Sequence, residues 1–393
     1  MRIKKRLITG KFILSVITAL DKLVAWIAKK IYYSRGQIQC NKVFFMTYDD
    51  GFTCNPSYIA QELIRRKAPV EIVWAGRPNA DFPKEIRVVP RGSFEMFEEM
   101  SSAKVWVDNA LNGVWYDMPK KKGQVYINTW HGSMGIKKLH GNRNWMMHAR
   151  RCKKLTDYCI ANSAFEENVY RETFWPDTPI LQYGHARNDV FFEKETAVQT
   201  REKVCSILGI EAGRKVCLYA PTFRDNGNTA CFNMDFARLK DALEQWFGGE
   251  WTILVRYHYK NRKQLPAMHA GDWLKDASDY ADMQELMIAA DMGISDYSSW
   301  VYDYILSRKP VLIYAPDLDD YDQQRGFYYP LESTPFPIAR SNDEIAACLN
   351  RFDETEYKNR VECFLKEKGC YETGRASSLA ADKILEVMGI KGE

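Results

Sequence analysis

Short apolar runs recur along the chain from Lys42 onward, and a segment with helical spacing separates each run from the next. This alternation is typical of a mostly parallel α/β sheet, because two parallel strands must be joined by a crossover, usually a helix. The runs form two series, Val43–Thr47, Val70–Ala75, Ile86–Val89, Val105–Val107, Val125–Thr129 and Tyr158–Ala161 in the first, and Val216–Tyr219, Ile253–Arg256, Trp273–Lys275, Met292–Ser295 and Val311–Tyr314 in the second. We therefore predict an α/β fold of two doubly wound, Rossmann-like domains that face one cleft.

The length of 393 residues is enough for two domains with separate cores. We expect the join near Thr196–Gly213, which is polar at first and ends in glycine. The predicted division is a leader at residues 1–35, a first domain at 36–205, a second at 206–375 and a C-terminal helix at 376–393. Residues 341–390 are expected to be helical and to pack back across the first domain. Asn55 and Pro56 are expected to open the first helix as its cap and first residue.

The leader at residues 1–35 reads as one amphipathic helix. It holds nine basic residues and one acidic residue, whereas the whole chain has a net charge of only +4. Its longest uncharged run, Phe12–Leu20, is well short of the roughly 18 residues that a membrane-spanning helix needs. A signal peptide is disfavoured because the helical pattern continues without a small-residue cleavage site. A basic amphipathic helix favours the membrane interface, and the alternative is a helix packed on the protein's own core.

The segment Asp291–Tyr329 reads as strand, tight turn, helix and strand. Its turn contains Ser298 and Ser299, where the free amides at a helix start and two hydroxyls can bind an anion. The alternative is that Asp296 and Ser298 only cap the helix. Arg325 follows in the same segment, and a guanidinium is a natural partner for a second phosphate. The segment is therefore a candidate diphosphate-binding site of a transferase.

Further polar residues lie at strand ends, where α/β proteins place function. His131 directly follows a strand and can act as a general base near neutral pH, although it can equally bond a loop carbonyl. Arg224 projects from the loop after another strand, and Arg256 and His258 alternate onto one face of a third strand end. The polar run Tyr183–Asp189 is as easily a turn as a site.

Residues 118–156 contain ten Lys or Arg residues and no Asp or Glu. A solvated surface usually mixes both signs, so this stretch indicates a polyanionic partner. Nucleic acid and anionic lipid both qualify, and the leader favours lipid. The candidate acceptor-binding or lipid-binding residues are Lys137, Lys138, Arg143, Arg150 and Arg151.

The ten cysteines include no C-x-x-C pair and no even ladder, which indicates neither a zinc site nor a disulfide framework. We infer a reduced, cytosolic compartment. Asp317, Asp319 and Asp320 resemble a turn rather than a metal site, and no other acidic cluster stands out. We therefore expect no bound metal and no tightly bound cofactor.

Six of these motifs occur in the order found in the CDP-glycerol glycerophosphotransferase family of teichoic acid synthesis, which the chain resembles over about residues 45–375. They are Gly51…Asn55-Pro56, Trp130-His131-Gly132, Ala220-Pro221-Thr222-Phe223-Arg224, Arg256-x-His258, Ser295-Asp296-Tyr297-Ser298-Ser299 and Arg325-Gly326-Phe327-Tyr328. The chain departs from the usual pattern at Ser133-Met134-Gly135, His185-Ala186 and Tyr259. The resemblance implies a GT-B fold and a CDP-alditol as donor substrate.

The resemblance also implies a reaction. An enzyme of this family would transfer glycerol phosphate from CDP-glycerol to an undecaprenyl-diphosphate-linked saccharide at the cytoplasmic face of the membrane, and release CMP. It would be peripheral to an anionic membrane surface, without a nucleic-acid partner. His131 and His258 would be the catalytic residues, and Arg224, Arg256, Ser298, Ser299 and Arg325 would bind the donor.

The chain length leaves little beyond two domains, which favours a primase-like enzyme that adds one or few units. The alternatives are a CDP-ribitol-using or polymerising member of the same family, a GT-B nucleotide-sugar glycosyltransferase, and a non-catalytic binder. The last would leave the ordered His, Arg and Ser residues without a purpose.

Overall fold

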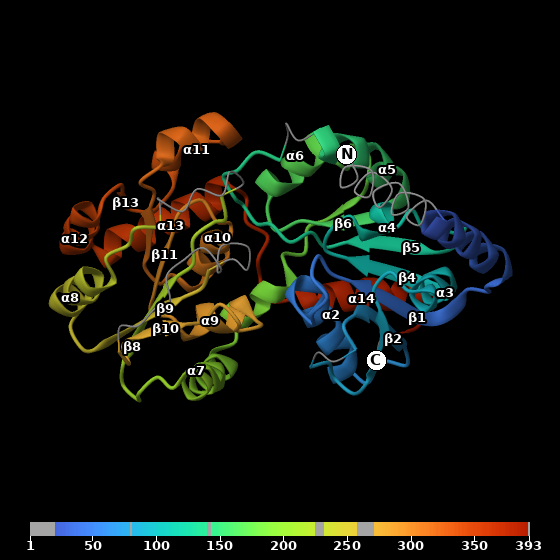
Figure 1. Ribbon diagram of the computed structural model, residues 1–393, viewed down its shortest axis with the longest axis horizontal. Helices are drawn as coiled ribbons and strands as arrows, with labels where there is room; N and C mark the ends of the chain where they lie inside the picture. Colours follow the sequence, from blue (N-terminus) through green and yellow to red (C-terminus); the bar gives the residue numbers. More distant parts are fainter. Residues whose placement is uncertain (1–19, 79–80, 140–142, 225–231, 258–270, 392–393) are drawn as a thin grey trace, which may run out of the picture. The chain divides into compact units, whose positions relative to one another are not determined.

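The computed structural model describes residues 20–78, 81–139, 143–224, 232–257 and 271–391 (Figure 1). The chain forms two compact units. The first comprises Met1–Trp130, His148–Cys159 and Ala380–Glu393, and the second comprises His131–Met147 and Ile160–Leu379. Two parallel sheets with helices between their strands confirm the predicted α/β fold.

The first sheet has seven strands in the order β3-β2-β1-β4-β5-β6-β7. Its strands are β1 Gln39–Met46, β2 Glu71–Gly76, β3 Ile86–Pro90, β4 Ala103–Asp108, β5 Val125–Asn128, β6 Tyr158–Ile160 and β7 Ile180–Leu181. The helices along this part of the chain are α2 Cys54–Arg65, α3 Phe94–Ser102, α4 Asn112–Trp115, α5 Arg143–Leu155 and α6 Ala164–Thr173. Val43, Phe44, Phe45 and Met46 are all fully buried, as expected for a central strand covered on both faces.

The second sheet has six strands in the order β10-β9-β8-β11-β12-β13. Its strands are β8 Lys215–Tyr219, β9 Trp251–Val255, β10 Leu274–Asp276, β11 Met292–Ser295, β12 Val311–Tyr314 and β13 Ile338–Ala339. Its α-helices are α7 Lys194–Leu208, α8 Phe236–Phe247, α9 Met283–Ala289, α10 Trp300–Tyr304, α11 Leu318–Arg325, α12 Asn342–Asn350, α13 Glu354–Glu367 and the first residues of α14 Ala376–Met388. Short 3-10 helices lie at η1 Ala186–Phe191, η3 Ile305–Ser307 and η4 Leu331–Ser333.

Alternation along β8 explains the two cores of the second sheet. Val216 and Leu218 point to the face covered by α7, α9, α10 and α13. Cys217 and Tyr219 point to the opposite face, which α8 and α12 cover. Successive side chains of a strand point to opposite faces, so an unbroken apolar run marks a strand buried on both.

Every predicted apolar run coincides with an observed strand, although several ends shift by one to four residues. The prediction missed β7 and β13, which have two residues each and so carry no apolar run of their own. The helical prediction for residues 341–390 is confirmed by α12, α13 and α14. The last part of α14 belongs to the first unit, as expected for a C-terminal helix that packs back.

The two compact units differ in extent from the predicted domains. The predicted first domain includes residues 131–147 and 160–205, yet both ranges belong to the second unit. The reason lies in packing, because Met134, Ile136 and Val204 are buried in a core cluster of the second unit and Phe165 packs against it.

Asn55 does not cap the first helix, so that prediction is wrong. Helix α2 begins at Cys54 with Thr53 as its N-cap residue. The Asn55 amide instead donates to the carbonyl oxygens of Thr129 at 2.9 Å and Trp130 at 3.1 Å. Its polar group is thus used to hold the turn that follows β5.

The described part of the leader, residues 20–35, is helical, and the predicted helix at residues 1–19 lies outside the described residues. Ala25 and Tyr32 pack against a core cluster of the first unit. The opposite side exposes large apolar residues, namely Leu20, Leu23, Val24, Trp26, Ile27 and Ile31. None of the helices in the described ranges is both long and apolar enough to cross a membrane.

Candidate active site

Loops that follow β8, β11 and β12 meet at one edge of the second sheet, because these parallel strands are neighbours. Asp296 joins two of the loops, since its Oδ1 accepts a hydrogen bond from the Thr222 amide at 2.8 Å. Ser295 Oγ donates to the carbonyl oxygen of Ala220 at 2.7 Å. The predicted strand-end motifs at residues 220–224 and 295–299 therefore lie side by side.

Arg224 is buried at this edge, with 4% of its surface exposed. Its Nη1 donates to Asp296 at 2.7 Å, and its Nε and Nη2 donate to Asp317 at 2.7 and 3.0 Å. The guanidinium also lies over the rings of Tyr297 and Tyr321, at 5.0 and 4.9 Å from their centroids. Arg224 thus holds three loops together, and direct contact with a diphosphate stays a prediction.

Asp317 belongs to this network and lies in the turn just before α11, as predicted. Burial acts to raise the pKa of its carboxyl, but Arg224 and the Tyr297 hydroxyl outweigh burial and lower it. Asp319 and Asp320 lie within the helix α11, in its first helical turn, so the prediction that they belong to a loop turn is wrong. The sequence feature that could have identified Asp317 as a site residue is its position, because it closely follows the apolar run Val311–Tyr314.

Ser298 and Ser299 lie half-buried at the start of α10. Ser299 is the N-cap residue, and within the described residues its side chain makes no capping hydrogen bond. Asp296 is directed to Thr222 and Arg224 rather than to α10, which argues against a purely capping role. Arg325 is the last residue of α11 and is also half-buried.

Residues 131–139 belong to the second unit and contact the motif at residues 325–328. The amide of Lys138 donates to Gly326 at 3.0 Å, and the amide of Tyr328 donates to Ile136 at 2.8 Å. The hydroxyl of Tyr329 donates to the Met134 carbonyl oxygen at 2.5 Å. The structure therefore brings together two motifs that lie almost half the chain apart.

The same segment approaches the Ser298–Ser299 turn at Gly135. A Cβ placed on Gly135 would lie 3.2 Å from the Cβ of Ser299, which is tighter than an ordinary contact, so a side chain here would require Ser299 to shift by a few tenths of an ångström. His131 precedes Gly135 by four residues and is half-buried. The candidate base and the candidate diphosphate site therefore belong to one compact unit.

Directly before His131, the backbone of Trp130 has a φ of +51°, a left-handed conformation that is uncommon for a bulky residue. The Trp130 amide donates to Asn128 Oδ1 at 2.8 Å, and its carbonyl oxygen accepts from Asn55. Two buried asparagines thus fix the backbone that leads to the candidate base, which is typical of a functional site.

Arg256 directly follows β9, on the same edge of the sheet as Arg224. Its amide donates to the carbonyl oxygen of Tyr219 at 2.9 Å, and its side chain is half-buried. His258, the second predicted catalytic residue, lies outside the described residues. Its predicted role stays a prediction.

The predicted acceptor-binding residues are divided between the units. Lys137 and Lys138 lie beside Phe327 and Gly326 in the second unit. Arg150 and Arg151 are exposed on α5 in the first unit, and the side chain of Arg143 lies outside the described residues. Some basic residues of the 118–156 stretch pair with acids just outside it, Lys120 with Asp157 and Arg151 with Asp117.

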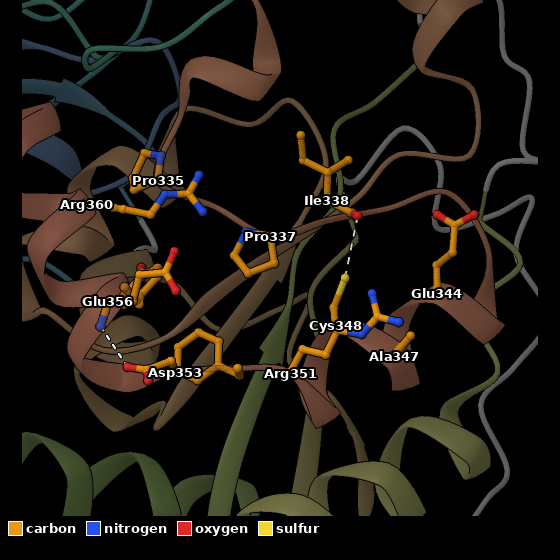
Figure 2. Close-up of a pocket in the computed structure, with 12 residues that line it drawn as sticks. Pro335, Pro337, Ile338, Glu344, Ala347, Cys348, Arg351, Asp353, Glu356 and Arg360 are labelled. Atoms are coloured by element: carbon orange, nitrogen blue, oxygen red, sulfur yellow. Dashed lines mark hydrogen bonds between the residues drawn. The ribbon is translucent and has the colours of Figure 1, made fainter.

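No group of three His, Cys, Asp or Glu side chains in the described ranges is placed to hold a metal ion. A separate cavity of about 350 Å³ lies between the amino end of β13, α12 and α13 (Figure 2). Its lining mixes charges of both signs, with Glu344, Arg351, Glu356 and Arg360 around Cys348. It lies at the opposite end of β13 from the functional loops, and we assign it no part in the site.

Residues 29–386 match the family model of the CDP-glycerol:poly(glycerophosphate) glycerophosphotransferases. A teichoic acid poly(glycerol phosphate) polymerase of Bacillus spizizenii is 28% identical over 85% of this chain and 89% of its own length. A teichoic acid glycerol-phosphate transferase of Staphylococcus aureus is 27% identical over 88% of this chain and 93% of its own length. In contrast, the chain covers only 48% and 54% of two longer poly(glycerol phosphate) polymerases.

Solved structures of the wall teichoic acid polymerase TagF resemble the whole chain. One has a TM-score of 0.81 at 25% identity and covers 96% of this chain and 97% of its own. Another, a variant soaked with CDPG, has a TM-score of 0.80 at 25% identity over 95% of this chain and 98% of its own. A UDP-GlcNAc 2-epimerase of Neisseria meningitidis shares only the fold, with a TM-score of 0.50 at 13% identity over 88% of this chain and 100% of its own.

Proposed function

Since the chain belongs to the CDP-glycerol:poly(glycerophosphate) glycerophosphotransferase family, we propose that it transfers glycerol phosphate from CDP-glycerol to a membrane-anchored, lipid-linked saccharide and releases CMP. Two relatives that match most of this chain and most of their own length carry glycerol phosphate in their names. The structure that carries the proposal is the contact between the His131 segment and the Ser298–Ser299 turn, because transfer needs a base and a diphosphate site together.

In the proposed reaction, an acceptor hydroxyl attacks the phosphorus that bears glycerol, and the bond from this phosphorus to the bridging oxygen breaks. The electron pair leaves with CMP, so negative charge develops on the leaving phosphate. Fixed hydrogen-bond donors and cations stabilise such charge. We assign this role to Ser298, Ser299, Arg256 and Arg325.

His131 is proposed to take the proton of the attacking hydroxyl, as a histidine near neutral pH can. His258 is proposed as a second catalytic residue that assists the leaving phosphate. Arg224 is proposed to act mainly through Asp296 and Asp317, because all three guanidinium nitrogens already donate to their carboxylates or to a neighbouring carbonyl oxygen.

The acceptor is proposed to be an undecaprenyl-diphosphate-linked saccharide at the cytoplasmic face of an anionic membrane. Support comes from the exposed apolar side of the helix at residues 20–35 and from the basic residues of the 118–156 stretch. Vesicle binding tests this. A chain that starts at residue 35 should leave anionic vesicles and stay folded, whereas unfolding would assign the helix to the core.

We propose that the enzyme is primase-like and adds one or few units. In this proposal, Lys137 and Lys138 bind the diphosphate of the lipid carrier near His131. Chain length no longer supports this, because a relative of almost the same extent is named a polymerase. The length distribution of the products with excess donor decides the matter. A single added unit supports the proposal, and a ladder of long products contradicts it.

Ribitol phosphate is the second candidate for the transferred group, since a ribitol-phosphate polymerase of Staphylococcus aureus is 29% identical over 86% of this chain. CMP release from CDP-glycerol and from CDP-ribitol, each with a lipid-linked saccharide, tests the proposed function. We expect acceptor-dependent CMP release from CDP-glycerol. Turnover of CDP-ribitol alone, or of neither donor, would contradict the proposal.

A further inference from the structure

Arg187 contacts the backbone of the segment that carries His131. It is the second residue of η1 and is 4% exposed. Its Nη1 donates to the carbonyl oxygen of His131 at 3.1 Å, and its Nη2 donates to the carbonyl oxygen of Gly132. One guanidinium therefore holds two consecutive carbonyls of the backbone that bears the candidate base.

Asp303 holds the same guanidinium from the other side. It is 2% exposed on α10, its Oδ2 accepts from Arg187 Nε at 3.0 Å, and it lies 2.9 Å from Nη2. Helix α10 directly follows the turn of Ser298 and Ser299. The Arg187–Asp303 pair thus links the His131 backbone to the helix of the candidate diphosphate site.

Asn188 fixes the orientation of Asp303. Its Nδ2 donates to Asp303 Oδ1 at 2.9 Å and to Glu372 Oε1 at 2.8 Å. Glu372 in turn accepts from the amide of His185 at 3.2 Å. Both oxygens of Asp303 are therefore engaged, so the carboxylate that orients Arg187 cannot rotate without breaking a buried hydrogen bond.

We propose that Arg187, oriented by Asp303, is a positioning residue that sets the place of His131 relative to the Ser298–Ser299 turn. The proposal rests on the proposed function and deepens it. Arg187 is not itself a donor-binding residue, because its three nitrogens point to Asp303 and to the two carbonyls. A displacement of a reacting group by about 1 Å can cost roughly 100-fold in rate.

The test replaces Arg187 with lysine, which keeps a positive charge beside Asp303 but loses the planar fork that reaches both carbonyls. Arg201 offers a matched control in the same unit. Its guanidinium also holds one carboxylate, Asp291, at 2.9 and 3.1 Å, and two carbonyls, those of Ala289 and Arg214. It lies on α7, and its hydrogen bonds within the described part of the chain join it to Asp291, Ala289 and Arg214 rather than to the His131 segment.

For Arg187→Lys we expect kcat to fall about 10–100-fold while KM for the donor changes less than about threefold. Arg201→Lys should keep kcat within about twofold. Hydrogen exchange of residues 131–139 should become at least about tenfold faster in Arg187→Lys and stay unchanged in Arg201→Lys. Wild-type kcat and exchange in Arg187→Lys would overturn the proposal.

A second comparison separates positioning from a merely structural role. In a chain that already carries His131→Ala, adding Arg187→Lys should lower kcat by less than about twofold, because the group being positioned is gone. A full additional loss would overturn the proposal. Asp303→Asn should reproduce the exchange change, and failure of both Arg187→Lys and Asp303→Asn to fold would also overturn it.

The exchange measurement needs no substrate, so the two proposals fail in different ways. If exchange is faster in Arg187→Lys but the unmodified protein releases no CMP, the proposed function is contradicted, whereas the effect of Arg187 on the His131 backbone is retained. If CMP release is normal but exchange and kcat are unchanged in Arg187→Lys, only the positioning role of Arg187 is contradicted.

Discussion

Gly135 and Ser299 approach so closely that a Cβ on Gly135 would lie 3.2 Å from the Cβ of Ser299. The two residues come from segments more than 160 positions apart, and their contact joins the segment that carries the candidate base to the turn of the candidate diphosphate site. A side chain added between these two segments is therefore expected to disturb the proposed site.

Gly135→Ala should displace Ser299 by a few tenths of an ångström and weaken donor binding by about 0.5–1.5 kcal/mol through a misaligned hydroxyl. Calorimetric titration with CDP-glycerol measures this. Gly51→Ala is the control, since its nearest contact, the Thr53 side chain at 3.4 Å, is ordinary. Equal donor affinities in the two variants would show that Ser299 does not contact the donor.

Ser298→Ala, Ser299→Ala and Arg325→Ala should each weaken donor binding by about 1–3 kcal/mol, as expected for lost charge-assisted hydrogen bonds. The same titration measures this. Ser307→Ala is a suitable control, because its hydroxyl bonds the Tyr304 carbonyl at the far end of the helix. Unchanged affinity in all three variants would rule out the diphosphate site.

Arg224→Met should lower the free energy of unfolding of the second unit by about 3–5 kcal/mol, because Asp296 and Asp317 would lose the cation that compensates their buried charge. Urea unfolding measures the change. Arg340→Met removes an exposed pair with Asp319 and should cost about 1 kcal/mol or less. Similar small losses in both variants would contradict the role given to Arg224.

Glu372 makes stability depend on pH. Burial raises the pKa of this carboxyl from its ordinary 4.5 to about 7, against the opposing effect of His185. Between these values the folded state binds more protons than the unfolded state, so stability falls as pH rises from about 4.5 to 7. The loss approaches about 3 kcal/mol, at about 1.4 kcal/mol for each pH unit.

Glu372→Gln should remove this decline, since an amide does not titrate, and Glu354→Gln on the surface should not. Urea unfolding between pH 5 and 8 measures the slopes. His185, Glu166 and Asp303 face the same region, and comparison of variant with parent isolates Glu372 from them. Parallel slopes in parent and Glu372→Gln would refute the prediction.

The strands and the loops at their ends could be predicted from the sequence because both faces of each sheet are buried. In β8, for example, Val216 and Tyr219 pack in different cores, and the result is an unbroken apolar run. The strand-end rule then placed Arg224 and Ser299 at one edge. The two-residue strands β7 and β13 could not be predicted, because pairing with a neighbouring strand, not an apolar run in the sequence, defines them.

The partners of the site residues could not be predicted from local pattern. Nothing near Arg224 shows that its charge is neutralised by Asp317, a residue 93 positions later. Asp303 sits in a helix of apolar residues, where spacing alone does not distinguish a buried counter-ion from a solvated carboxylate. Residues 131–139 contact the segment at residues 326–328 partly through backbone hydrogen bonds, which form regardless of side-chain identity and so leave no signal in the sequence.

The central claim is that His131 takes the acceptor proton beside a donor bound at the Ser298–Ser299 turn. Single-turnover CMP release by His131→Ala, with donor affinity measured in parallel, tests it most directly, and His148→Ala on α5 serves as the histidine control. We expect His131→Ala to slow release by roughly 10²–10⁴-fold with donor affinity nearly unchanged. Release at the parent's rate in His131→Ala, or a loss of rate fully explained by lost donor binding, would contradict the account.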